Sequence, residues 1–301
     1  MFPKTLCFFR FPSTTDFASV DELLPHARLK PVGPLEMSSR GFISPFGRED
    51  TEHLSHRIGE ILWLTVGGED KLLPAAVVND ELEKKLLAIE EREGRRPGGR
   101  ERKRIKDDLL HELLPRAFVK TSRVDVYLDL KHGYAAVMTS SRKSGENVMS
   151  DIRSLLGSFP AMPLNAEVAP RSILTAWIAG EPLPDGLSLG EECGMKDPVE
   201  GGAVLRCQHQ ELRCDEIDKH LDAGKQVSHL ELIFEDNLRF VLGDDLIVRK
   251  LKFLDGALDR LDSDSAEGAR AEIDARFALA SAEVRRLFTM IEAAFKVSSA
   301  D

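Results

Sequence analysis

The sequence predicts an α+β protein in which antiparallel hairpins and meanders pack with helices. Short apolar runs bounded by turn residues recur along the chain, which is typical of antiparallel strands. Helical patterns do not alternate with these runs in the βαβ order of a doubly wound sheet. With 42% hydrophobic and 31% charged residues among 301, the chain has the composition of a globular protein with a sizeable core.

The first elements expected are a strand, a helix and a second strand. Leu6 to Phe11 is an apolar and aromatic run that predicts a strand, and helix-capping residues follow it at Pro12 to Asp16. Three prolines and three glycines between Pro31 and Gly47 predict a loop or an irregular extended segment. A compact strand is expected over Ile61–Val66, and Gly67-Gly68 should end it.

The middle of the chain predicts three helices and a hairpin. Pro74 suits a first helical turn, and helical spacing then predicts a helix to Glu93. A second helix is expected from about Glu101 to Leu114, before Pro115. Alternating apolar residues predict a hairpin of Arg123–Asp129 and Tyr134–Thr139. A further helix over Ser144–Gly157 should end at its glycine.

A Pro-rich segment at residues 159–163 predicts a boundary between two α+β regions, 1–160 and 161–301. The residues from Gly180 to Gly202 include three prolines and predict a long surface connection. The later part should form an antiparallel meander followed by a long terminal helix. The elements expected are helices over Pro170–Trp177, Asp215–Ala223 and about Ala257–Val297, and strands over Ala203–Cys207, Val227–Phe234, Leu238–Leu242 and Leu246–Leu254.

Charge is unevenly distributed along the chain. The formal total is -10, yet Lys84 to Lys106 holds ten basic and four acidic residues, within a basic helical arm of about residues 74–118. Glu181 to Asp245, in contrast, holds sixteen acidic and six basic residues. The arm is either a contact site for an anionic partner or a solvated helix pair jointed at Gly94 and Pro97-Gly98-Gly99.

No catalytic or metal-binding motif is complete. Gly186-Leu187-Ser188-Leu189-Gly190 matches the string of a hydrolase nucleophile elbow, but no apolar strand precedes it. His111-Glu112 lacks the second histidine of a helical zinc site, and no phosphate-binding loop or dinucleotide fingerprint is present. The residues Cys207, His209, Cys214 and His220 lack zinc-site spacing. We therefore expect no enzyme, cofactor or metal.

Composition also bears on location and on the kind of nucleic acid that could bind. No apolar run is long enough to span a bilayer and the N-terminus is not a signal peptide, so a cytoplasmic protein with no membrane contact is expected. Only two Trp and two Tyr are present, although single-strand binding usually relies on aromatic stacking. Any nucleic-acid contact should therefore engage duplex phosphates without sequence preference.

Several ordered motifs resemble the recombination-associated protein RdgC family across nearly the whole chain. They begin at Phe8-Phe9-Arg10 and end in the C-terminal helix. The most specific are Lys71-Leu72-Leu73-Pro74, His111-Glu112-Leu113-Leu114-Pro115-Arg116-Ala117-Phe118, Leu155-Leu156-Gly157-Ser158-Phe159-Pro160, Leu174-Thr175-Ala176-Trp177, Ala223-Gly224-Lys225 and Arg249-Lys250-Leu251-Lys252-Phe253.

This resemblance implies a horseshoe subunit that forms a ring-shaped homodimer around double-stranded DNA, without sequence specificity. It also implies a nucleoid location and a role in limiting filament formation by a RecA-type recombinase. Gln208-His209 stand where the family usually has a lysine pair, which puts a neighbouring contact in doubt. The residues implied in DNA binding or ring closure are Arg116, Phe118, Gln210 and Lys225, and the arm adds Arg95, Arg96, Arg100, Arg102 and Lys103.

Three functions stay open from the sequence. The first is the non-enzymatic DNA-binding ring. The second is a protein-interaction module in which the basic arm docks an acidic partner, and the third is a hydrolase that uses Ser188. Phe118 likewise has two alternative roles, as a core residue at the start of a strand or as a contact between subunits.

Overall fold

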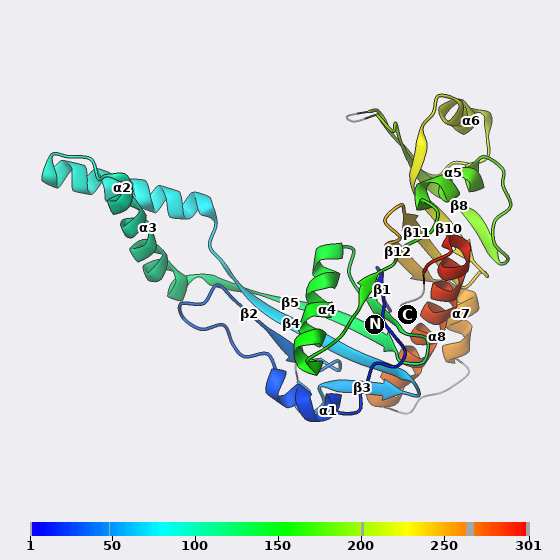
Figure 1. Cartoon of the computed structure of the whole chain (residues 1–301), viewed down its shortest axis with the longest axis horizontal. Helices are drawn as coiled ribbons and strands as arrows, with labels where there is room; N and C mark the ends of the chain where they lie inside the picture. Colours follow the sequence, from blue (N-terminus) through cyan, green and yellow to red (C-terminus); the bar gives the residue numbers. More distant parts are fainter. Residues whose placement is uncertain (1, 48, 200–201, 263–267, 299–301) are drawn as a thin grey trace.

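A computed structural model describes residues 2–47, 49–199, 202–262 and 268–298. It contains two antiparallel sheets and eight α-helices within these residues, which confirms the predicted α+β class. One sheet occupies the centre of the molecule, and a helical arm projects from its end (Figure 1). The second sheet stands at the other end of the long axis, so the arm and the second sheet are widely separated.

The central sheet has the strand order β2-β4-β5-β6-β1-β7, and β3 pairs with β4 outside this path. Its longest strands, β4 and β5, pair over twelve residues from Ile61↔Asp129 to Leu72↔Phe118. The strands are β1 (Cys7–Arg10), β2 (Ser38–Ile43), β3 (Ser55–Ile58), β4 (Ile61–Leu72), β5 (Phe118–Asp129), β6 (Tyr134–Val137) and β7 (Met162–Pro163).

Both faces of the central sheet are buried where it crosses the body. In β4, Leu62 and Leu64 pack on one side with α1 (Val20–Leu23) and α4 (Arg142–Leu156), whereas Trp63 packs on the other with α8 (Ala269–Phe295). This alternation follows from the two-residue period of a strand. The apolar runs of the sequence are continuous here because both faces need apolar side chains.

The second sheet is a meander with the order β12-β11-β10-β8-β9. Leu230, Leu232 and Phe234 of β10 belong to the core that includes α5 (Pro170–Ile178) and α8, while the alternate residues of β10 are partly exposed. One face of this sheet is therefore open to solvent. The strands are β8 (Leu187–Lys196), β9 (Val204–Cys207), β10 (Gln226–Phe234), β11 (Leu238–Gly243) and β12 (Val248–Phe253), and α6 (Asp215–Asp222) lies between β9 and β10.

Helix α8 joins the two halves of the chain. Its Phe277 ring lies 4.8 Å from that of Tyr127 in the central sheet, and its Phe295 ring lies 5.4 Å from Trp177 of α5. Its Arg285 Nε donates to Asp129 Oδ2 at 2.6 Å. The N-terminal segment also bridges the sheets, because Leu6 and Val248 exchange backbone hydrogen bonds of 2.9 Å.

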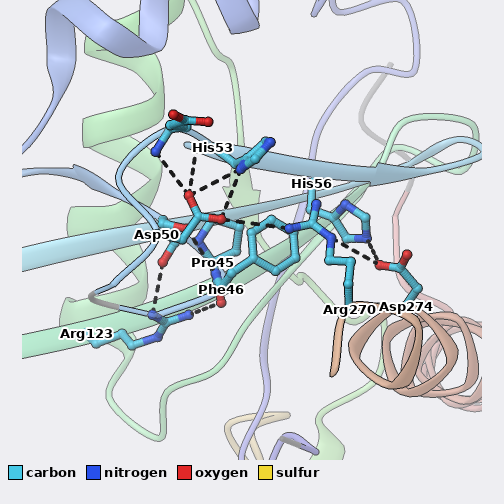
Figure 2. A network of polar contacts seen from close by, with 10 residues as sticks. Pro45, Phe46, Asp50, His53, His56, Arg123, Arg270 and Asp274 are labelled. Atoms are coloured by element: carbon cyan, nitrogen blue, oxygen red, sulfur yellow. Dashed lines mark hydrogen bonds and ion pairs between the residues drawn. The ribbon is translucent and has the colours of Figure 1, made fainter. Parts of the chain in front are cut away.

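A polar network fixes the start of α8 against the loop before β3 (Figure 2). Arg270 lies over the Phe46 ring, 3.3 Å from its centroid, and is flanked by the carboxylates of Asp50 and Asp274 at 3.8 and 3.9 Å. His56 Nε2 is 2.9 Å from Asp274 Oδ1. The network therefore ties residues some 220 positions apart in the sequence.

The arm consists of α2 (Ala75–Glu93), α3 (Gly99–Leu113) and the short 3-10 helix η2 (Leu114–Arg116). Gly94 ends α2 in the left-handed conformation, and its N–H donates to the Glu90 carbonyl at 2.8 Å. A small core of Val78, Leu82, Leu86 and Leu109 holds the two helices together. The arm is an extension of β4 and β5, so the long central hairpin carries it away from the body (Figure 1).

Three predictions about local structure are wrong. The segment Pro31–Gly47 contains β2, Gly67-Gly68 continue β4, and the predicted connection Gly180–Gly202 contains β8. At Gly67 the prediction failed because the glycine allows close packing inside a strand; a Cβ there would meet the side chains of Ile43 and Leu29. The terminal helical region is two helices, α7 (Asp255–Asp262) and α8, and residues 263–267 between them lie outside the described residues.

Candidate nucleic-acid interface

Most of the predicted arm cations are neutralised by carboxylates of the arm itself. Arg95 donates to Glu101 at 2.7 Å, Arg96 to Glu90 at 3.2 Å, and Arg102 to Glu83 at 2.6 Å. The Arg95 guanidinium lowers the pKa of the Glu101 carboxyl, and it does so chiefly through this hydrogen bond. The positive charge available to a partner is therefore smaller than the residue count indicates.

Two of the predicted arm residues keep their charge available. Arg100 and Lys103 are exposed near the start of α3 and form no hydrogen bond or ion pair within the described chain. The neighbouring Lys106 is exposed in the same way, three residues after Lys103. Residues three apart lie on one side of a helix. Lys103 and Lys106 thus present two unpaired cations on a common face of α3.

Arg116 and Phe118 lie at the neck of the arm, where the helices return to the sheet. Arg116 ends η2, is exposed and forms no hydrogen bond or ion pair with described residues, although its charge helps to lower the pKa of Glu112. Phe118 is the first residue of β5, and 83% of its surface is exposed. The core alternative for Phe118 is therefore wrong.

Exposed apolar side chains lie near Phe118 on both faces of the hairpin at this neck. Leu72, its cross-strand partner, and Val119 are also about half exposed. Leu35 and Met37 add further exposed apolar surface beside them, because the Lys71 N–H donates to the Met37 carbonyl at 2.8 Å and the Lys71 ammonium donates to the Pro34 carbonyl. Exposed apolar side chains gathered at the base of a charged arm mark an interaction surface.

Gln210 and Lys225 lie on either side of α6, at the far end of the molecule from the arm. Gln210 Nε2 donates to Glu216 Oε2 at 2.8 Å, and its backbone N–H donates to the Glu191 carbonyl of β8. Lys225 Nζ lies 3.0 Å from His220 Nδ1, after the turn at Gly224. Within one chain, the structure does not bring these two residues together with the arm.

A family model described as "Putative exonuclease, RdgC" matches residues 1–298. The chain belongs to the RdgC family. Curated relatives named recombination-associated protein RdgC align with 100% of both chains. The identity is 79% in Stenotrophomonas maltophilia (strain R551-3), 73% in Xanthomonas axonopodis pv. citri (strain 306) and 72% in Xanthomonas oryzae pv. oryzae (strain MAFF 311018).

The geometry of this RdgC family member also removes one alternative. Ser188 lies within β8 and pairs with Ile233 of β10, and the strand continues for eight residues after it. A nucleophile elbow needs a sharp turn from a strand into a helix. The hydrolase alternative therefore lacks its required structure. Within the described residues, no three His, Cys, Asp or Glu side chains gather as a metal site, and no helix is long and apolar enough to cross a membrane.

Sequence reasoning missed a group of cations on the solvent face of the second sheet. Lys196 and Arg206 are exposed there, on β8 and β9, in a segment whose total charge is strongly negative. The signal that could have found Arg206 is the alternation along Val204–Cys207. Leu205 and Cys207 pack toward the core, so Arg206 points to the other face. Because Gly180–Gly202 was predicted to be a surface connection, the pairing of β8 with β9 was not expected.

Proposed function

We propose that this protein binds double-stranded DNA without sequence preference and closes around it as a homodimeric ring. The observation that carries the proposal is that one projecting arm has both cations without ion pairs and an exposed apolar neck. Cations such as Arg100, Lys103 and Arg116 would neutralise phosphates, and Phe118 would contact a second subunit. The relatives' name, recombination-associated protein, supports a task on DNA.

The ring requires contacts that close on themselves. Two-fold symmetry is the simplest way to close a ring of identical chains. The arm and the α6 region lie at opposite ends of an elongated subunit (Figure 1), so each subunit offers two separated surfaces to a partner copy. Two such subunits would enclose a central space, and the cations of both arms would then act on one duplex.

The cellular role in this proposal is to limit filament formation by a RecA-type recombinase, in the nucleoid of the cytoplasm. A ring on the duplex would act by occupying DNA. Direct contact with the recombinase is the other route. A variant that no longer binds DNA separates the two, because inhibition of filament formation by such a variant would require direct contact.

Two other functions are outcomes of the same experiments. The family description names an exonuclease, so purified protein should be incubated with linear duplex and Mg²⁺ or Mn²⁺; we expect the DNA to stay intact. The arm could instead dock an acidic protein. In that case polyglutamate should bind the full-length protein, and duplex affinity should be negligible near 0.15 M salt.

Salt titration on two unrelated duplexes tests the DNA-binding part. Affinities should agree within a few fold, and log K should fall linearly with log salt by about 0.9 for each phosphate contacted. A tenfold preference for one sequence at fixed salt contradicts the proposal.

Topology tests the ring itself. Protein assembled on a closed circular duplex should resist a high-salt wash, whereas protein on the same DNA after linearisation should slide off. Equal loss from both forms contradicts encirclement, and sedimentation as a monomer at micromolar concentration contradicts the homodimer.

A further inference from the structure

We infer that a groove beside the N-terminal segment is a docking site for a partner protein, which inserts an acidic peptide that also carries large apolar side chains. The groove has a volume of about 700 Å³, and residues 2–4, β12, α7 and α8 line it. These elements lie in the half of the molecule away from the arm (Figure 1). The inference therefore goes beyond DNA binding and adds a second, separate contact surface.

The N-terminal segment and β12 form one apolar wall of the groove. The Leu251 N–H donates to the Lys4 carbonyl at 2.9 Å, which holds residues 2–4 beside this edge strand. The Phe2 ring stacks on the Phe253 ring, with 4.4 Å between their centroids. Both rings are only partly buried, so they leave apolar surface facing the groove.

Helix α7 forms the opposite wall. Its Ala257 is fully buried, whereas Leu258 and Leu261 are only partly buried and line the groove. The two leucines are three residues apart and therefore lie on one side of the helix. Their remaining apolar surface is in contact with solvent, and covering such surface is favourable. Both walls of the groove thus favour apolar side chains in an occupant.

The charged residues that line the groove are all basic, in a protein whose formal total is -10. Lys4 and Lys252 are exposed, and their ammonium groups form no hydrogen bond or ion pair with any described residue. Arg276 pairs with Glu272 at 2.6 Å on the surface of α8. An exposed pair of this kind contributes little stability, so a carboxylate of a ligand can replace that of Glu272. The groove therefore favours an anionic occupant.

These two properties together indicate an acidic peptide. Duplex DNA presents phosphates but no apolar side chain that would enter a groove. Phe2 and Phe253 stack on each other, so neither ring has both faces free for a base. An extended peptide places carboxylates on the cations and apolar side chains against the walls, which is how grooves commonly bind peptides. Opposite charge would also speed the encounter.

Fluorescence anisotropy of a labelled peptide tests the groove in the full-length protein. The probe is a run of glutamates ending in two phenylalanines, and the wild type should bind it. Replacing its glutamates by serines or its phenylalanines by glycines should weaken binding at least about tenfold, because each change removes one kind of contact.

Two double variants with the same change in net charge locate the binding site. Lys4→Glu/Lys252→Glu reverses the unpaired cations of the groove and should abolish peptide binding, whereas Lys4→Gln/Lys252→Gln should weaken it about fivefold. Lys30→Glu/Lys120→Glu is the matched control. It reverses two exposed cations at the arm end of the central sheet and should leave the affinity unchanged.

A further variant tests the groove by gain of affinity. Glu272→Gln releases Arg276 from its ion pair, so peptide binding should become about twofold tighter. Failure of the wild type to bind the probe near about 0.1 M salt overturns the inference, as does equal loss in the groove variant and the control.

Other occupants are separate outcomes of these measurements. Displacement of the peptide by duplex DNA would assign the groove cations to nucleic acid. Slower sedimentation of Lys4→Glu/Lys252→Glu than of the wild type would assign the groove to a second copy of the chain. Either result overturns the inference. Duplex binding through the arm is unaffected by any of these outcomes, so the proposed function is tested independently.

Discussion

Phe118 and Leu72 are directly opposite each other at the outer end of the β4–β5 hairpin, and neither is buried. Phe118 is 83% exposed and Leu72 49% exposed. Elsewhere in the same two strands, cross-strand partners such as Leu62 and Leu128 are fully buried. The hairpin is therefore a core element at one end and an apolar contact surface at the other.

Phe118→Ala should leave the free energy of unfolding nearly unchanged, because the exposed side chain buries little apolar surface in the folded chain. Self-association and retention on circular duplex should both weaken, as expected for an aromatic contact at an interface. Thermal melting, sedimentation and the salt wash are measured on the same variant. Phe240→Ala is the matched control: Phe240 is fully buried, so its loss should cost about 3–5 kcal/mol. A similar loss for Phe118→Ala contradicts the exposed position.

Arm cations should differ in their contribution to duplex binding according to whether they are paired. Arg100→Gln/Lys103→Gln removes two unpaired charges and should lower the salt slope by up to about 1.8. Arg95→Gln/Arg102→Gln removes two charges that Glu101 and Glu83 already neutralise, so the slope should change less. Equal slopes for the two variants would show that the arm's ion pairs open on DNA.

Asp129 should be a strong stability determinant because it anchors α8 to the central sheet. It is 1% exposed and accepts hydrogen bonds from Arg285 Nε at 2.6 Å and from the His132 backbone N–H at 3.0 Å. Asp129→Ala leaves these donors unpaired and should cost about 1.5–3 kcal/mol in chemical denaturation. Lys120→Ala, an exposed change near the other end of the same strand, β5, should cost under about 0.5 kcal/mol.

Asp129 also predicts part of the acid sensitivity. Burial raises the pKa of this carboxyl, but the hydrogen bonds from Arg285 and His132 outweigh burial and lower it below the ordinary value. A lowered pKa in the folded state stabilises the protein above the unfolded-state pKa, near 4, and that contribution is lost as pH falls further. Below pH 4, the free energy of unfolding should depend less steeply on pH for Asp129→Asn than for the wild type. Chemical denaturation at a series of pH values measures this dependence.

His56 should make the fold less stable as pH falls from neutrality. Burial lowers the pKa of His56 below its ordinary value, and Arg270 and His53 lower it further, although Asp274 opposes them. The unfolded chain therefore binds the proton first, so the contribution of neutral His56 to stability is lost as pH drops below about 6.5. His56→Gln should flatten the stability profile between pH 7 and 5.5. An unchanged profile would assign the pH dependence to other groups.

The sequence by itself determined most of the helices and most of the strands. Pro74 and Gly94 bound α2, and Gly157 ends α4, because backbone conformation at these residues is local. The alternation of Val124, Val126 and Leu128 predicted the inner half of β5. The ordered motifs, spread over almost the whole chain, predicted the RdgC family, which the family model and the relatives confirm.

Tertiary structure alone decided which side chains reach solvent and which charges remain unpaired. Phe118 is exposed because β5 extends beyond the body, a length that no local pattern encodes. Arg102 is neutralised by Glu83 from another helix, whereas Arg100 is not. Arg206 shares the solvent face of the second sheet with Lys196 only because β8 and β9 pair in the register Gly194↔Arg206 and Lys196↔Val204. Each of these facts depends on pairing between residues distant in sequence, and that pairing is fixed by burial of the shared core.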